Sequence, residues 1–183
     1  MDTNYTEKFK KTTINLLNLL KSIITELHEE KFVGFNENAV TIIITLLDAK
    51  SGDDLIWCLA SVCKDWHKII SKDPTFVTQD FTKAIRSSGL PLDTNILTCP
   101  FTCYDAISKS NAWKDVEKDD WPVSDEDLDC IWEKIHLLAR ITCHYIHNLR
   151  KKNLHKPMQP KLDPVYENME LDTYARMFGV QLS

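Results

Sequence analysis

The sequence predicts an all-α fold, a single-domain helical bundle of about six helices with a Pro-rich C-terminal extension. In several long stretches the apolar residues recur every three or four positions, which is the period of an amphipathic helix. Only 4 of the 183 residues are glycine, whereas globular proteins usually contain ~7%. Because phosphate-cradling loops and tight hairpins depend on glycine, a Rossmann, P-loop or many-stranded β fold is not expected.

The first predicted helix spans residues 5–30, where lysines and glutamates fill the gaps between apolar residues at helical spacing. Residues 32–38 interrupt this pattern with a glycine and two asparagines. Residues 39–47 are rich in β-branched side chains, which suit either a strand or a buried helix. We predict a helix because the chain offers no second strand to pair with it. A turn follows at residues 50–53.

One continuous helix is predicted from Leu55 to Ile70, because its apolar residues form a single stripe. It should end near Lys72, since Pro74 disfavours helical geometry in the residue before it. A further short helix is predicted within residues 75–87.

In the C-terminal half, a helix is predicted from Cys99 to Ser108. Residues 115–129 hold eight acids around Trp121, and this charge density predicts an exposed loop. The longest helix spans residues 128–149, with acids at its start and cations after its end, which complements the helix dipole. The helices at 5–30 and 128–149 should be the long struts of the core.

The tail carries prolines at positions 157, 160 and 164, which should preclude regular structure there. A last short helix is predicted at residues 169–178, stopped by Gly179. The core should bury three large aromatic side chains, which are Trp66, Phe81 and Trp132.

Residues 38–81 carry several short motifs in a fixed order. These are Leu46, Leu47 and Asp48, then Asp54 and Leu55, then Val62, Cys63 and Trp66, then Ile69 and Ile70, then Asp73, Pro74 and Phe76. The order resembles the F-box, the three-helix module by which substrate receptors dock onto the Skp-type adaptor of cullin-RING ubiquitin ligases. The segment departs from that family at the opening Leu-Pro, near whose place Phe35 and Asn36 stand, and in its first turn.

The resemblance implies a partner-binding surface made by Leu46, Leu47, Leu55, Val62 and Trp66. It also implies that residues 90–183 bind an unknown target protein. The same stripe fits an ordinary core helix, because any packed helix needs an apolar face.

The chain therefore divides into four segments. Residues 1–37 form an N-terminal amphipathic helix and turn, and residues 38–89 form the F-box-like helical segment. Residues 90–156 form a helical region with the acidic loop and the long helix, and residues 157–183 form the Pro-rich tail with a short terminal helix.

Four residues are of the types that zinc prefers and fall in two clusters: Cys99, Cys103, Cys143 and His147. They lack the tight Cys-x2-Cys spacing of familiar zinc knuckles, so we predict buried thiols and neither a metal nor a cofactor. The chain also lacks the sequence motifs of metalloproteases, α/β-hydrolases and P-loop enzymes, so no enzymatic activity is expected.

A basic patch follows the long helix and consists of Arg150, Lys151, Lys152 and Lys156. Such a patch suits phosphate or an acidic protein surface, or it complements the end of the helix dipole. The acidic residues 115–129 of a second copy would provide one such surface, in a head-to-tail contact.

The net charge of −5 and the pI near 5.7 argue against a protein that coats nucleic acid or an anionic membrane. No apolar run approaches the ~18 residues of a membrane span, and no secretory signal is apparent, so we expect a cytoplasmic or nuclear location. The predicted function is a non-enzymatic interaction adaptor of the F-box-like type. The alternative is a structural assembly protein, such as a small viral or particle component, held by neighbouring copies.

Overall fold

The computed structural model describes residues 4–155 and 160–183, and within these ranges it contains helices and no β-strand. The all-α class is therefore confirmed. The described residues form nine α-helices rather than about six: α1 Tyr5–Glu29, α2 Glu37–Asp48, α3 Gly52–Ala60, α4 His67–Ile70, α5 Thr82–Ser88, α6 Thr94–Ser108, α7 Asp125–His155, α8 Pro164–Glu167 and α9 Leu171–Met177. Short 3-10 or π-helical turns lie between them: η1 Cys63–Asp65, η2 Phe76–Phe81, η3 Asn111–Trp113 and η4 Lys118–Asp120.

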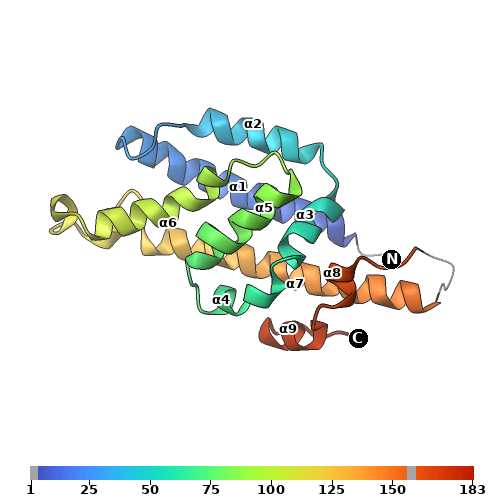
Figure 1. The fold of residues 1–183 in the computed structure, drawn as a ribbon. Helices are drawn as coiled ribbons and strands as arrows, with labels where there is room; N and C mark the ends of the chain where they lie inside the picture. The colour runs from blue at the N-terminus through green and yellow to red at the C-terminus, as the bar shows by residue number, and fades with distance from the viewer. Residues whose placement is uncertain (1–3, 156–159) are drawn as a thin grey trace.

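The two longest helices, α1 and α7, lie side by side through the middle of the molecule (Figure 1). This confirms the two predicted struts. α2 packs along the outer side of α1, α3 and α6 pack against α1, and α5 packs against α3 and α6. The three aromatic side chains expected in the core, Trp66, Phe81 and Trp132, are all buried.

α1 forms where local sequence and packing agree. Asn4 caps it, because its side-chain oxygen accepts a hydrogen bond from the backbone N–H of Glu7 at 3.1 Å. Apolar residues at helical spacing, among them Leu20, Ile24 and Leu27, are completely buried against its neighbours. Burial of this stripe, rather than intrinsic helix propensity, supplies most of the stability of such a helix.

The prediction of one continuous helix from Leu55 to Ile70 is wrong, because the structure divides this stretch into α3, η1 and α4. The backbone leaves the helical path at Val62, with φ −108° and ψ 20°. The fold-back allows the indole Nε1 of Trp66 to donate a hydrogen bond to the carbonyl oxygen of Leu59 at 3.1 Å. In an unbroken helix these seven residues would rise about 10.5 Å along the axis, which is too far for that bond.

α6 begins at Thr94 rather than Cys99 and contains Pro100. Asp93 caps its start by accepting a hydrogen bond from the N–H of Asn95 at 2.9 Å. Proline has no N–H for the carbonyl of Ile96 four residues earlier. The thiol of Cys99 donates to that carbonyl instead, at 3.5 Å, which is one reason why the helix tolerates the proline.

The acidic loop is exposed only in part. Its acids reach solvent, but Trp121 and Val123 are buried, and the Trp121 indole donates to the carbonyl oxygen of Val116 at 3.2 Å. Most of the acids of the loop are exposed, as predicted, whereas its buried apolar residues, which anchor it, were not expected.

The C-terminal tail is more ordered than its prolines predicted. Pro164 begins α8, at a position where a backbone N–H would have no partner within the helix. Asp163 caps the helix, because its carboxylate accepts a hydrogen bond from the N–H of Val165 at 2.8 Å. Pro157 lies outside the described residues. α7 extends to His155, past the predicted end at residue 149. Within the described residues, no helix is long and apolar enough to cross a membrane.

Candidate functional site

The structure buries four of the five side chains that the F-box resemblance assigned to partner binding. Leu47, Leu55, Val62 and Trp66 are between 0% and 8% exposed, whereas Leu46 is 47% exposed. The expectation that Leu47 and Leu55 remain available on the surface is therefore corrected. Both belong to the hydrophobic core, because α2 and α3 each turn one apolar face toward α1.

Trp66 is sealed by the C-terminal tail, which no sequence pattern indicated. Its ring makes edge contacts with Tyr174 at 5.4 Å and Phe178 at 5.5 Å between ring centroids. Both geometries are favourable for aromatic pairs. In this chain, α9 and the residue that follows it thus occupy one side of Trp66, and no partner protein can reach that side while the tail is docked.

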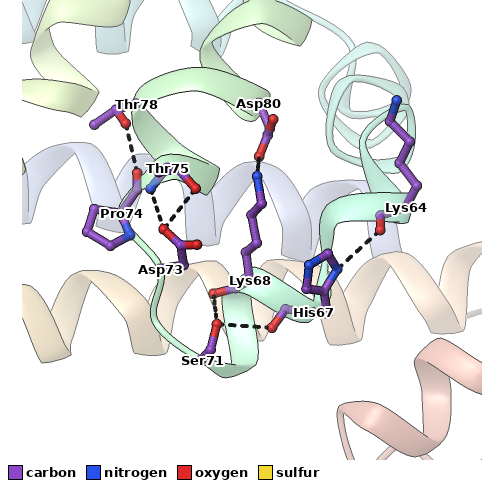
Figure 2. Close-up of polar contacts among 9 residues, drawn as sticks. All are labelled: Lys64, His67, Lys68, Ser71, Asp73, Pro74, Thr75, Thr78 and Asp80. Carbon is purple, nitrogen blue, oxygen red and sulfur yellow. Dashed lines mark hydrogen bonds and ion pairs between the residues drawn. The ribbon is translucent and has the colours of Figure 1, made fainter.

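The Asp-Pro motif of the F-box-like segment forms a local polar corner between α4 and η2, shown in Figure 2. The Asp73 carboxylate accepts hydrogen bonds from the backbone N–H of Thr75 at 2.9 Å and from its hydroxyl at 2.8 Å. These bonds favour the charged carboxylate and lower the pKa of Asp73. In this chain the motif therefore has an identifiable role in forming a turn.

An ion pair closes the same corner. Lys68 Nζ lies 2.6 Å from an Asp80 carboxylate oxygen, and both side chains are about one-fifth exposed (Figure 2). The hydrogen bond to Asp80 raises the pKa of Lys68. Nearby, His67 Nδ1 faces the carbonyl oxygen of Lys64 at 3.3 Å, and burial raises the pKa of the Cys63 thiol. A thiol with a raised pKa is a poor nucleophile.

Two of the three large exposed apolar side chains of the F-box-like segment lie on α2, and the third, Ile70, lies on α4. Ile42 is 61% exposed and Leu46 is 47% exposed. Ala39 and Ala49 continue the same stripe at spacings of three residues. No charged residue occurs from Asn38 to Leu47. The sequence prediction included Leu46 but missed Ile42, although this uncharged stretch was a visible signal.

The two clusters of possible zinc ligands are not brought together. Cys99 and Cys103 lie on α6, and Cys143 and His147 lie on α7, where His147 Nε2 contacts the Ser183 carbonyl oxygen at 2.8 Å. Burial and the neighbouring Cys63 raise the pKa of Cys143 to about 12. Among the described residues, no three His, Cys, Asp or Glu side chains gather in a way that would hold a metal ion.

The basic patch is largely used within the chain. The Arg150 guanidinium donates hydrogen bonds to three carbonyl oxygens of the tail, those of Tyr166, Glu167 and Met169, at 2.6 to 3.1 Å. Lys151 donates to the carbonyl oxygen of Ser183. Lys152 borders a surface hollow with Tyr145, and Lys156 lies outside the described residues. A head-to-tail contact through Arg150 and Lys151 would therefore have to displace the tail.

The chain matches no protein-family model, and neither the curated proteins nor the solved structures give a significant match.

Proposed function

We propose that this protein is a non-enzymatic, F-box-like interaction adaptor that docks a Skp-type partner on the exposed face of α2 and recruits a target to a cullin-RING ubiquitin ligase. The observation that carries the proposal is the uncharged apolar stripe around Ile42 and Leu46, which is exposed. Aliphatic side chains side by side on one helix are suited to anchor a protein interface.

The position of α2 supports this role. α2 packs against α1 through Val40, Ile43 and Leu47, which are buried. Its exposed stripe can therefore be covered by a partner without any rearrangement of the core. Leu46 belongs to both the motif that resembles the F-box and the exposed stripe. Both the resemblance and the exposure therefore support Leu46 as a contact residue.

A binding measurement with a purified Skp-type adaptor tests the proposal. The variant Ile42→Ala with Leu46→Ala should weaken binding by about thirtyfold or more, because truncation of a central interface anchor typically costs about 2 kcal/mol. The matched control is Thr41→Ala with Thr45→Ala, two exposed residues on the same helix whose hydroxyls bond only to carbonyls of α2. The control should bind like the wild type. Absence of adaptor binding by the folded wild type, or equal binding by both double variants, would contradict the proposal.

A structural assembly protein is the second candidate. The observation that favours it lies on α7, away from the α2 stripe, where Glu133 and Arg140 flank the exposed side chain of Leu137. A self-associating particle component would use this surface to contact copies of itself rather than an adaptor.

A further inference from the structure

A hollow of about 420 Å³ lies between α4 and α7. Its apolar lining includes Ile70 and Leu137, which are 45% and 40% exposed, and both rank among the few large exposed apolar side chains of the described residues. The charged residues of the lining are Glu133, Arg140 and Lys72. The surface therefore combines a small apolar centre with one acid and two bases.

The order of these residues along α7 is regular. Leu137 follows Glu133 by four residues and precedes Arg140 by three, so the three side chains lie on one face of the helix. Glu133 and Arg140 are exposed, and neither forms an ion pair with another residue within the described ranges. One turn before Glu133, Asp129 is already paired with Lys72 at 2.7 Å. The uncompensated charge of this face is therefore an acid on one side of Leu137 and a base on the other.

Such a face is its own complement. A twofold axis perpendicular to α7 near Leu137 would run a second copy of the helix antiparallel to the first. Glu133 of each copy would then oppose Arg140 of the other, which makes two equivalent ion pairs, and the two Leu137 side chains would meet near the axis. The helix dipoles would also run in opposite directions, which is favourable.

We infer that this face of α7 binds the same face of a second copy of the chain, in a twofold dimer with reciprocal Glu133–Arg140 pairs. A self-complementary patch is what a twofold contact requires. A purely acidic or purely basic partner would satisfy only one of the two charges and repel the other. The apolar centre is small, so the dimer should be weak, with a Kd of about micromolar or higher, and it should weaken as salt screens the pairs.

Sedimentation equilibrium at low ionic strength tests this arrangement with charge reversals. Glu133→Arg would place two arginines opposite each other in both halves of the dimer, and Arg140→Glu would do the same with glutamates. Each single variant should raise the dimer Kd at least tenfold. The double variant Glu133→Arg with Arg140→Glu restores opposite charges and should dimerise within about threefold of the wild type.

An equimolar mixture of the two single variants provides the sharpest readout. One chain then carries two arginines and the other two glutamates at these positions, so the mixture should form a one-to-one heterodimer although neither variant dimerises alone. Lys83→Glu on α5 changes the charge of an exposed residue elsewhere and should leave the wild-type dimer unchanged. Circular dichroism verifies that every variant is folded.

Three results would overturn the inference: a wild type that stays monomeric at several hundred micromolar in low salt, single variants that dimerise like the wild type, or a folded double variant that does not recover dimerisation. The outcome is separate from that of the proposed adaptor function, because none of these substitutions lies on α2. Ile42→Ala with Leu46→Ala should still dimerise.

Discussion

Two parts of the F-box-like segment use the same kind of side chain in opposite ways. On α2, Ile42 and Leu46 face solvent, whereas from α3 to η2 most large apolar residues, such as Leu55, Trp66 and Phe76, are buried and Ile70 is the exception. The reason is the number of helices that pack against each part. α2 packs mainly against α1, whereas α3 packs against α1, α5, α7 and α8. An apolar stripe is therefore accessible to a partner only where the fold leaves one side of its helix uncovered.

The largest expected effect is on stability and comes from Leu47→Ala combined with Leu55→Ala. Each truncation of a buried leucine typically costs ~2–5 kcal/mol, and a domain of this size has only ~5–15 kcal/mol in total. We expect loss of the cooperative helical signal in a circular-dichroism melt. Ile42→Ala with Leu46→Ala, which removes the same kind of atoms from the exposed stripe, should melt close to the wild type. If instead the Leu47 and Leu55 variant melted like the wild type, these leucines would not be core residues.

An intermediate effect on stability is expected from Arg150→Ala, which tests whether Arg150 holds the C-terminal tail against Trp66. The guanidinium donates four hydrogen bonds to tail carbonyls, and a hydrogen bond that involves a charged group typically contributes about 1.5–3 kcal/mol. Since these bonds share one side chain, we expect a total loss of about 2–3 kcal/mol in urea unfolding.

Arg150→Lys should recover part of this loss, because lysine keeps the charge but lacks the planar fork. Lys83→Ala, at an exposed position on α5, should change stability by less than about 0.5 kcal/mol. A loss for Arg150→Ala no larger than that of Lys83→Ala would mean that Arg150 does not hold the tail.

The smallest effect concerns Asp73 in the polar corner between α4 and η2. Its hydrogen bonds from Thr75 lower its pKa in the folded state, so the contribution of the charged form is present above the unfolded pKa of about 3.9 and is lost as pH falls through the lower folded value. Asp73→Asn should therefore lower the melting temperature by a few degrees near pH 7. The difference from the wild type should shrink below about pH 4.

Melting curves between pH 3 and pH 7 would measure this difference. Asp115→Asn, in the exposed part of the acidic loop and without a hydrogen bond within the described residues, is the control and should follow the wild type at each pH. A constant difference between Asp73→Asn and the wild type across the range would exclude a contribution from the carboxylate charge.

The sequence by itself determined the fold class and the two long helices. The periodic pattern at residues 5–30 became α1, and the pattern at 128–149 lies inside α7. It also identified Trp66 and Trp132 as core residues. These features are predictable because apolar periodicity is a local property, repeated over many residues, and a long run of it leaves only one face to bury.

The tertiary structure alone decided which parts of the apolar stripes meet a neighbour. Burial of Leu47 and exposure of Ile42 depend on where α1 lies, and the burial of Trp66 depends on Phe178, more than one hundred residues away in the chain. The break after α3 and the docking of the tail by Arg150 also rest on specific hydrogen bonds, from Trp66 to Leu59 and from Arg150 to Tyr166. Such contacts produce no periodic pattern in the sequence, so the same pattern of residues can be buried in one place and exposed in another.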